Sequence, residues 1–98
     1  MTTVAFHPEA RLEYLDAADF YEKRRAGLGA RFTLEVEAAI GRICESPRRW
    51  PVLAQDVRRC LTNTFPFGVL YTIEPEGILI VAIMHCSRKP GYWNGRVD

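Results

Sequence analysis

The sequence predicts a single α+β domain in which two helices pack against a mostly antiparallel sheet. Two amphipathic segments come first, joined by a glycine-containing link, and extended apolar segments separated by turn residues follow. Helices followed by a run of strands are typical of an α+β fold rather than of an alternating α/β fold. The 98 residues suffice for one hydrophobic core. We therefore expect one domain over residues 1–98, with an N-terminal strand, a helical hairpin and then a three-stranded, mostly antiparallel sheet.

The N-terminal stretch predicts a short strand followed by a long helix. Residues Thr3–Phe6 include β-branched and aromatic side chains, which favour extended structure. Pro8 and Glu9 favour a helix start, because proline fits the first turn and an acidic group stabilises the positive end of the helix dipole. The helix is expected from Pro8 to Arg25. Its apolar face comprises Tyr14, Leu15, Ala17, Ala18 and Tyr21, and its solvent face comprises Glu13, Asp16, Asp19, Glu22 and Lys23.

A glycine link and a second amphipathic helix complete the predicted hairpin. Gly27 and Gly29 permit the left-handed backbone conformations that end helices. The next apolar residues recur at helical spacing, and Pro47 stops the helix after Ser46. These apolar residues are Phe32, Val36, Ala39, Ile40 and Ile43. Two helices joined by so short a link are expected to pack side by side.

A proline-bounded loop over residues 46–55 precedes the first strand of the C-terminal half. Within the loop, Trp50 is expected to pack back on the helices. Residues 57–62 alternate in the manner of a strand, so Arg58 and Arg59 are predicted to point to opposite faces of the sheet.

Two further strands form a predicted β-hairpin. Phe67–Ile73 is rich in β-branched and aromatic residues, and residues 74–77 form a turn before the strand Ile78–His85. This last strand is apolar at both alternating positions, which is typical of an inner strand covered on both faces.

Composition excludes several classes of protein. Hydrophobic residues make up 48% and charged residues 26%, and no stretch approaches the length of a membrane span. The N-terminus lacks a secretory signal pattern, so a cytoplasmic protein without membrane contact is expected. The three cysteines contain no CxxC pair, which predicts reduced thiols rather than disulfides or a metal site. Phosphate-loop, HExxH and GxSxG motifs are absent, and we expect no cofactor.

Basic and aromatic side chains follow the predicted inner strand where it leaves the sheet. Residues 48–98 carry seven Lys/Arg against four Asp/Glu, whereas residues 1–47 carry six against eight, so the C-terminal half favours an anionic partner. If the strands are neighbours, four cations converge on one hollow that suits a phosphate backbone or a carboxylate. The candidate partner-binding or nucleic-acid-binding residues are Arg58, Arg59, Arg88, Lys89, Tyr92 and Trp93.

Each candidate also has a structural interpretation, and the sequence leaves both open. His85 suits proton transfer, because the imidazole side chain gains and loses a proton near neutral pH, but a histidine at a strand end is also a common hydrogen-bonded residue. Tyr92 and Trp93 are able to stack nucleobases, or they close the edge of the core, which we favour for Trp93. Each single arginine is also compatible with ordinary solvated surface charge.

Three stretches resemble toxins of bacterial type II toxin–antitoxin modules in the RelE/ParE superfamily, particularly its ParE-like branch. They are FHPEARLEYLDAADFYEKRRAGLGARF, SPRRWPVL and VRRCLTNTFPFGVLYTIEPEGILIVAIMHCSRKPGYW, and together they cover nearly the whole chain. The most specific parts are the Arg59 strand leading into Phe65–Phe67 and Tyr71, and the closing segment 85–93. The resemblance implies a toxin that a cognate antitoxin neutralises in a hetero-oligomer.

The resemblance implies one of two targets, DNA gyrase or ribosome-bound mRNA. If the chain is a metal-independent ribonuclease, the resemblance assigns catalysis to Arg59, His85, Arg88 and Tyr92. The low net charge of +1 and the absence of carboxylates within the predicted strands are atypical of the nuclease branch. We therefore favour gyrase inhibition, with a ribosome-dependent endoribonuclease as the alternative and a non-toxic, degenerate member of the superfamily as the third interpretation.

Overall fold

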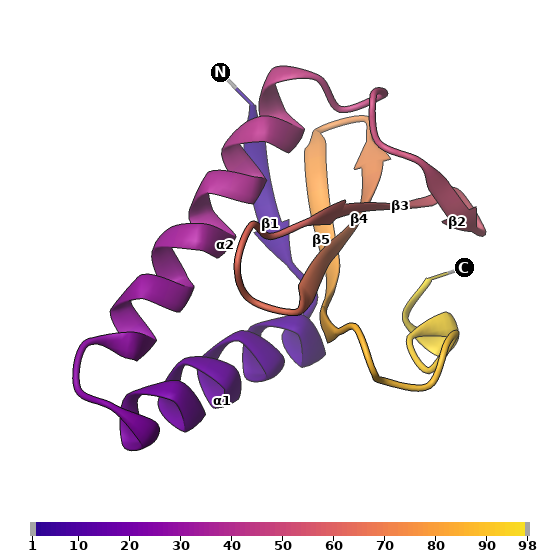
Figure 1. Ribbon diagram of the computed structural model, residues 1–98. Coiled ribbons are helices and arrows are strands. Elements are labelled where there is room, and N and C mark those ends of the chain that lie inside the picture. The colour runs from indigo at the N-terminus through magenta and orange to yellow at the C-terminus, as the bar shows by residue number, and fades with distance from the viewer. Residues whose placement is uncertain (1, 98) are drawn as a thin grey trace.

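The computed structural model describes residues 2–97, in which a helical hairpin covers one face of a five-stranded sheet (Figure 1). The elements are β1 (Thr3–Phe6), α1 (Pro8–Arg24), α2 (Leu28–Glu45), β2 (Val52–Ala54), β3 (Val57–Leu61), β4 (Phe67–Glu74), β5 (Gly77–His85) and a short 3-10 turn (Asn94–Arg96). No helix among these residues has the length and apolarity needed to cross a membrane.

The sheet has the strand order β1-β5-β4-β3-β2, so the prediction of three strands was wrong. The predicted N-terminal strand joins the sheet as β1, parallel to β5, and β2 pairs antiparallel with β3 inside the predicted loop. β2 spans only three residues and is followed by Gln55 and Asp56, which have positive φ angles of 51° and 63°. A strand this short, set between a proline and a tight turn, shows no recognisable period in the sequence.

Hydrophobic side chains fill both faces of the sheet. On the helix side, α1 and α2 pack on β3, β4 and β5 around Phe32, Val36, Ile43, Val69 and Tyr71. On the other side, residues of β3, β4 and β5 form a second cluster with Trp93 of the C-terminal segment. Figure 1 shows this segment lying across the sheet from the helices. The structure confirms that β5 is an inner strand, because most of its side chains are buried on both faces.

A bulge in β5 changes which residues of that strand contribute side chains to each of the two hydrophobic clusters. Leu70 pairs with Ala82, but the next residue, Tyr71, pairs with Ile80, so Val81 is the extra residue in the ladder. The bulge shifts the alternation of side chains by one position. As a result Ile80 and Ile83 both face the helices, while Val81 and Ala82 both face the C-terminal segment.

The two glycines of the helical link have different roles. Gly27 adopts a left-handed conformation with φ of 88°, as predicted. Gly29 instead lies within α2 where it crosses α1, and a Cβ atom there would approach the carbonyl oxygen of Ala18 to 2.6 Å. Glu22 of α1 accepts hydrogen bonds from the Gly27 and Gly29 amides at 3.0–3.1 Å, so it caps the start of α2 rather than facing only solvent.

Substituting two glycines of α2 should have opposite effects on stability. Gly29→Ala should lower the free energy of unfolding by about 1–3 kcal/mol, because the new methyl group meets backbone that must shift. Gly41→Ala should raise it by up to about 1 kcal/mol, because that site is open and alanine favours helix. Urea denaturation of both variants measures the difference. Equal effects at the two sites would contradict the close crossing of α1 and α2.

Candidate binding site

Two of the predicted arginines line one open hollow on the sheet face opposite the helices. The alternation of β3 puts Arg59 on this face, and its aliphatic stem crosses β4 at Gly68, where an added Cβ would lie 3.0 Å from Arg59 Cγ and Cδ. Arg88 approaches from the segment after β5. The hollow has a volume of about 380 Å³, and we call it the Arg59–Arg88 hollow. Its lining residues are Leu53, Ala54, Arg59, Met84, Cys86, Arg88, Pro90, Gly91, Trp93 and Asn94.

A second hollow of about 400 Å³ adjoins the first at Arg59, and we call it the Arg42–Arg59 hollow. It lies between the end of α2 and β3, where Arg42 donates a 3.0 Å hydrogen bond to the carbonyl oxygen of Leu61. Its lining residues are Arg42, Trp50, Pro51, Arg59, Leu61, Thr62 and Asn63. Among the described residues, no Asp or Glu lines either hollow. No sequence pattern pointed to Arg42, which is one of the cations on an amphipathic helix.

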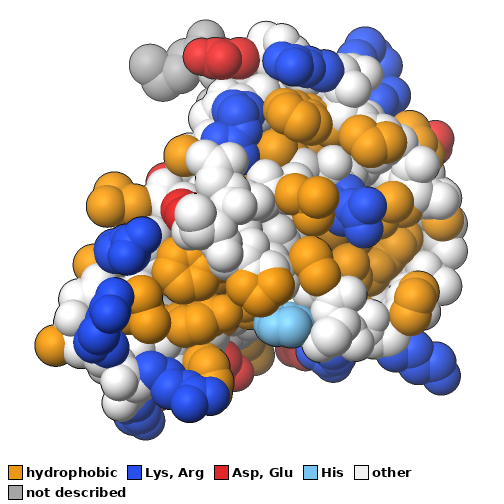
Figure 2. All heavy atoms as spheres, in the orientation of Figure 1, with side chains coloured by type: hydrophobic (Ala, Val, Ile, Leu, Met, Phe, Trp, Pro, Cys, Tyr) orange, Lys and Arg blue, Asp and Glu red, His pale blue; other side chains and the backbone are white. Residues whose placement is uncertain are grey.

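Figure 2 shows the same pattern at the surface. In the region of β2 and β3, apolar side chains gather around basic ones, and acidic side chains are sparse. Leu53 and Leu61 belong to this region and are 39% and 48% exposed. The two hollows therefore combine apolar surface with positive charge, which suits a ligand that carries both an apolar group and an anion.

Arg58 does not join this surface, so the predicted convergence of four cations was wrong. It points to the helix side of the sheet, where it donates hydrogen bonds to the carbonyl oxygens of Arg48 and Trp50 at 3.0 and 2.7 Å. These bonds secure the loop between α2 and β2. Lys89 is exposed beside Arg88 but does not line either hollow. Two strand arginines that are adjacent in sequence thus have separate roles because successive side chains alternate across the sheet.

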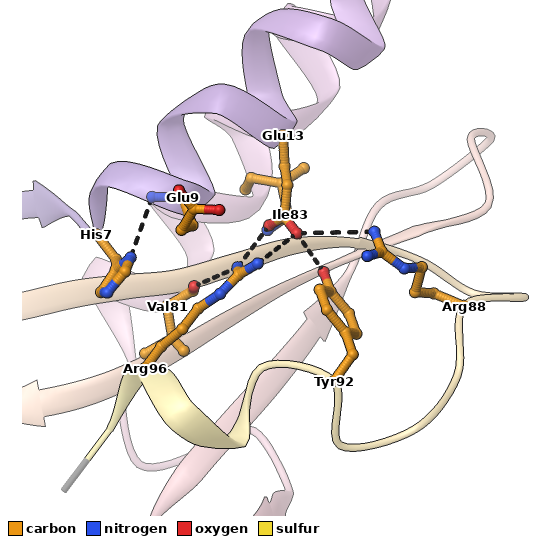
Figure 3. A network of polar contacts seen from close by, with 8 residues as sticks. All are labelled: His7, Glu9, Glu13, Val81, Ile83, Arg88, Tyr92 and Arg96. Atoms are coloured by element: carbon orange, nitrogen blue, oxygen red, sulfur yellow. Dashed lines mark hydrogen bonds and ion pairs between the residues drawn. The ribbon is translucent and has the colours of Figure 1, made fainter.

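A polar network centred on Glu13 fixes the segment that carries Arg88 (Figure 3). Glu13 projects from α1, its side chain is only 15% exposed, and its two carboxylate oxygens accept hydrogen bonds from both terminal nitrogens of Arg96 at 2.9 Å. The same carboxylate accepts from the Tyr92 hydroxyl at 2.7 Å and lies 4.0 Å from Arg88. The prediction that Glu13 lies on a solvent face was therefore wrong.

The network also provides hydrogen-bond partners for backbone groups in the part of β5 that does not pair with β1. β1 pairs with β5 only as far as Ile80, which leaves the next part of that edge of β5 without a neighbouring strand. Glu13 accepts a 3.1 Å hydrogen bond from the Ile83 amide, and Arg96 donates a 3.1 Å hydrogen bond to the carbonyl oxygen of Val81 in the bulge. One side chain from α1 and one from the C-terminus thus complete the edge of the inner strand. Sequence separations of about seventy and fifteen residues explain why no local pattern revealed these contacts.

Tyr92 and Trp93 serve mainly to hold the C-terminal segment in place. Trp93 is 3% exposed and packs in the second cluster, so its ring is not available to stack on a nucleobase, and the structural interpretation favoured for it is confirmed. Tyr92 lies under Arg88, whose guanidinium is 4.0 Å from the ring centre. Burial, followed by the hydrogen bond to Glu13 and its charge, raises the pKa of Tyr92 far above its ordinary value. The hydroxyl therefore remains protonated and donates to Glu13.

His85 lies on the other face of the sheet from Arg59. It pairs with Phe67 of the helix-side cluster, and the two ring centres are 5.1 Å apart in an edge arrangement. Its Nδ1 accepts a 3.0 Å hydrogen bond from the Ser87 amide and lies 2.7 Å from the Ser87 hydroxyl. The structure thus does not bring Arg59, His85, Arg88 and Tyr92 together as one catalytic group. His85 instead terminates β5 by binding the turn that follows.

The cysteines do not form a metal site within the described residues. All three are free thiols: Cys60 is buried, Cys44 is partly buried and Cys86 is exposed at the Arg59–Arg88 hollow. No group of three His, Cys, Asp or Glu side chains in residues 2–97 is arranged to hold a metal ion.

Comparison with known proteins assigns the chain to a family. Residues 4–90 match the family described as the ParE toxin of the type II toxin–antitoxin system parDE. The fold is similar to a solved chain from the chromosomal ParDE toxin–antitoxin system of P. aeruginosa, with a TM-score of 0.75, 13% identity, and coverage of 87% of this chain and 96% of that chain. No curated protein sequence matches the chain. Because the family match spans most of the sequence, the chain belongs to the ParE toxin family of type II toxin–antitoxin systems.

Proposed function

We propose that this protein is a cytoplasmic toxin that inhibits DNA gyrase and is neutralised by a cognate antitoxin in a hetero-oligomer. The observation that carries the proposal is the arrangement of the basic sheet face: Arg59 and Arg88 line a hollow without an acid and base beside them. Such a surface suits binding to another macromolecule more than it suits bond cleavage.

The helical hairpin supports the presence of a protein partner. Its outward faces carry large apolar side chains that the monomer leaves exposed. These are Leu12, Leu15 and Phe20 on α1, each 52–54% exposed, and Leu34 on α2, which is 69% exposed. Leu15 was expected to belong to the apolar face of α1 that packs in the core. Large apolar side chains that remain exposed on both helices are compatible with a protein interface, so we propose that the antitoxin covers this hairpin and the basic sheet face.

The positions of the candidate catalytic residues favour inhibition over RNA cleavage. Attack by a ribose hydroxyl on a phosphate needs a base and an acid within hydrogen-bond reach of the reacting atoms. His85 faces the helix side of the sheet, and the Tyr92 hydroxyl donates its proton to Glu13. Neither group is therefore free to act beside Arg59 in this arrangement.

Expression without an antitoxin, followed by assay of the purified protein, tests the proposal. Expression should arrest growth and induce the DNA-damage response, and the protein should block supercoiling of relaxed plasmid by gyrase while ribosome-bound transcripts stay intact. Arg59→Gln and Arg88→Gln should weaken the block, because each removes a cation from the hollow. Arg24→Gln is the matched control, because Arg24 lies on α1 over the Phe20 ring.

Two results would contradict the proposal. Codon-specific transcript cuts with normal supercoiling would assign the protein to the endoribonucleases. Normal growth with full gyrase activity would support the non-toxic interpretation.

A further inference from the structure

Three guanidinium groups gather where the end of α2 meets β3 and the loop between α2 and β2. Arg42 and Arg59 line the Arg42–Arg59 hollow, and the guanidinium of Arg49 lies 5.1 Å from the ring centre of Trp50, another lining residue. Burial raises the pKa of the Cys60 thiol, and the neighbouring Arg42 and the charge of Arg49 oppose this rise. Both arginines therefore lie close to one thiol, and the three positive charges share one small region.

No carboxylate within residues 2–97 forms an ion pair with these three side chains. The ion pairs among the described residues all involve other cations. Arg42 donates its 3.0 Å hydrogen bond to the carbonyl oxygen of Leu61, which is a neutral acceptor. Arg42 and Arg59 are only partly exposed, so water screens their charges less than those of fully exposed side chains. A partly buried group of like charges is unfavourable by itself and favours the binding of an anion.

The number and the chemistry of these groups favour a phosphate monoester as the anion. A phosphate monoester carries a charge of about −1.5 to −2 at pH 7 and has three terminal oxygens that accept hydrogen bonds. A carboxylate or a phosphodiester carries a single negative charge. Guanidinium groups bind phosphate oxygens through pairs of parallel hydrogen bonds. Several arginines around one hollow are therefore better matched by a doubly charged group than by a singly charged one.

The remaining lining of the hollow favours a phosphate that carries an apolar, planar group. Trp50, Pro51 and Leu61 supply apolar surface, and Asn63 adds an amide that both donates and accepts hydrogen bonds. The volume of about 400 Å³ lies in the range of about 300–1,000 Å³ that is typical of small-molecule sites. Inorganic phosphate alone would leave most of this volume unfilled. A nucleobase combines a planar apolar face with a polar edge and fits this lining.

We propose that the Arg42–Arg59 hollow binds a nucleotide through a terminal phosphate monoester. The phosphate lies between Arg42 and Arg59, with Arg49 beside it, and the base packs against Leu61 and Trp50. The inference goes beyond the proposed function, because it concerns a small ligand and does not depend on toxicity. A free nucleotide and the phosphorylated end of a nucleic acid both present this group, and the experiment separates the two sources.

Isothermal titration calorimetry of the purified protein tests the chemistry of the ligand. The probes are adenosine 5′-monophosphate (AMP), adenosine, inorganic phosphate and the dinucleoside monophosphate ApA, whose only phosphate is a diester. AMP should bind about tenfold more tightly than each of the others, because only AMP joins a doubly charged phosphate to a base. Addition of a 5′-phosphate to ApA identifies the source. Affinity about tenfold above that of AMP would assign the site to nucleic-acid ends, and affinity equal to that of AMP would assign it to free nucleotides.

Variants of the protein test the position of the phosphate. Arg42→Gln should weaken AMP binding about tenfold, because it removes one of the two guanidinium groups that line the site. Arg49→Gln should weaken binding about threefold, and it changes an exposed side chain, so it tests the site even if Arg42→Gln fails to fold. Arg31→Gln is the matched control, because Arg31 is an exposed arginine earlier on α2 that lines neither hollow. Circular dichroism and thermal melting establish which variants are folded.

Nuclear magnetic resonance locates the ligand, because each of the two hollows is lined by one of the two tryptophans. The indole N–H of Trp50 is buried and has no hydrogen-bond partner within residues 2–97. AMP should shift the indole signal of Trp50 and leave that of Trp93 in place. Trp50→Phe removes one of the two signals and so assigns them.

Four results would overturn the inference. They are no binding of AMP at millimolar concentration, equal affinity for AMP and adenosine, equal AMP affinity of Arg31→Gln and Arg42→Gln, and a shift of the Trp93 signal alone. None of these measurements involves gyrase or growth. Absence of nucleotide binding would therefore refute only the nucleotide site, and normal growth with full gyrase activity would refute only the proposed function.

Discussion

Glu13→Ala should lower the free energy of unfolding by about 3 kcal/mol, because it leaves a paired and largely buried arginine without its partner. The Arg96 side chain is 13% exposed and makes both of its 2.9 Å contacts to the Glu13 carboxylate. The same substitution removes the acceptors of the Tyr92 hydroxyl and the Ile83 amide. Urea denaturation measures the total loss.

Amide hydrogen exchange measures how much the loss of the Glu13 hydrogen bond to the Ile83 amide contributes to this destabilisation. The Ile83 amide should exchange faster in Glu13→Ala, because its acceptor comes from Glu13 and not from a strand. Glu13→Gln should lose less stability, because an amide oxygen still accepts a hydrogen bond. Asp16→Ala, an exposed change on the same helix, is the matched control. If Glu13→Ala were no more destabilising than Asp16→Ala, the network would not hold the C-terminal segment.

Phe32→Ala should lower the free energy of unfolding by about 4 kcal/mol, through lost burial and the cavity that remains. Phe32 is fully buried at the centre of the aromatic contacts that join the hairpin to the sheet. Its ring centre lies 4.9–6.2 Å from those of Tyr14, Tyr21, Phe65 and Phe67. Chemical denaturation of the purified variant measures the effect.

Phe20→Ala is the matched control for this change. Phe20 is on α1 and 52% exposed, so removing its ring should cost less than about 1 kcal/mol. Similar losses for the two substitutions would mean that the exposed ring contributes as much as the central one. That result would contradict the packing described for the hairpin.

Periodicity predicted most of the elements closely. The bounds expected for α1, β3, β4 and β5 and the expected end of α2 differ from those observed by one residue at most, whereas α2 begins at Leu28, inside the segment expected to form the glycine link. Each of these segments is long enough for burial on one or both faces to impose a repeat on the sequence. β2 was missed because three residues carry no such repeat, and β1 was predicted as a strand but not as a member of the sheet.

The candidate site was predicted only in part. Arg59 and Arg88 share a hollow as expected, whereas Arg58 and His85 lie on the opposite face and Trp93 is buried. Alternation along β3 already predicted that only one of Arg58 and Arg59 would face a given side. Which side carries the hollow depends on the position of the C-terminal segment, and the sequence contains no local sign of it.

The sequence by itself determined the hairpin, the inner strand and the resemblance to the family, because these depend on local spacing and burial. The tertiary structure alone decided which cations meet and what Glu13 does. A carboxylate on α1 becomes the partner of Arg96 and Tyr92 only when β5 and the C-terminal segment pack beside it. Contacts between residues about eighty positions apart leave no periodic trace along the chain, because they depend on the packing of complete elements.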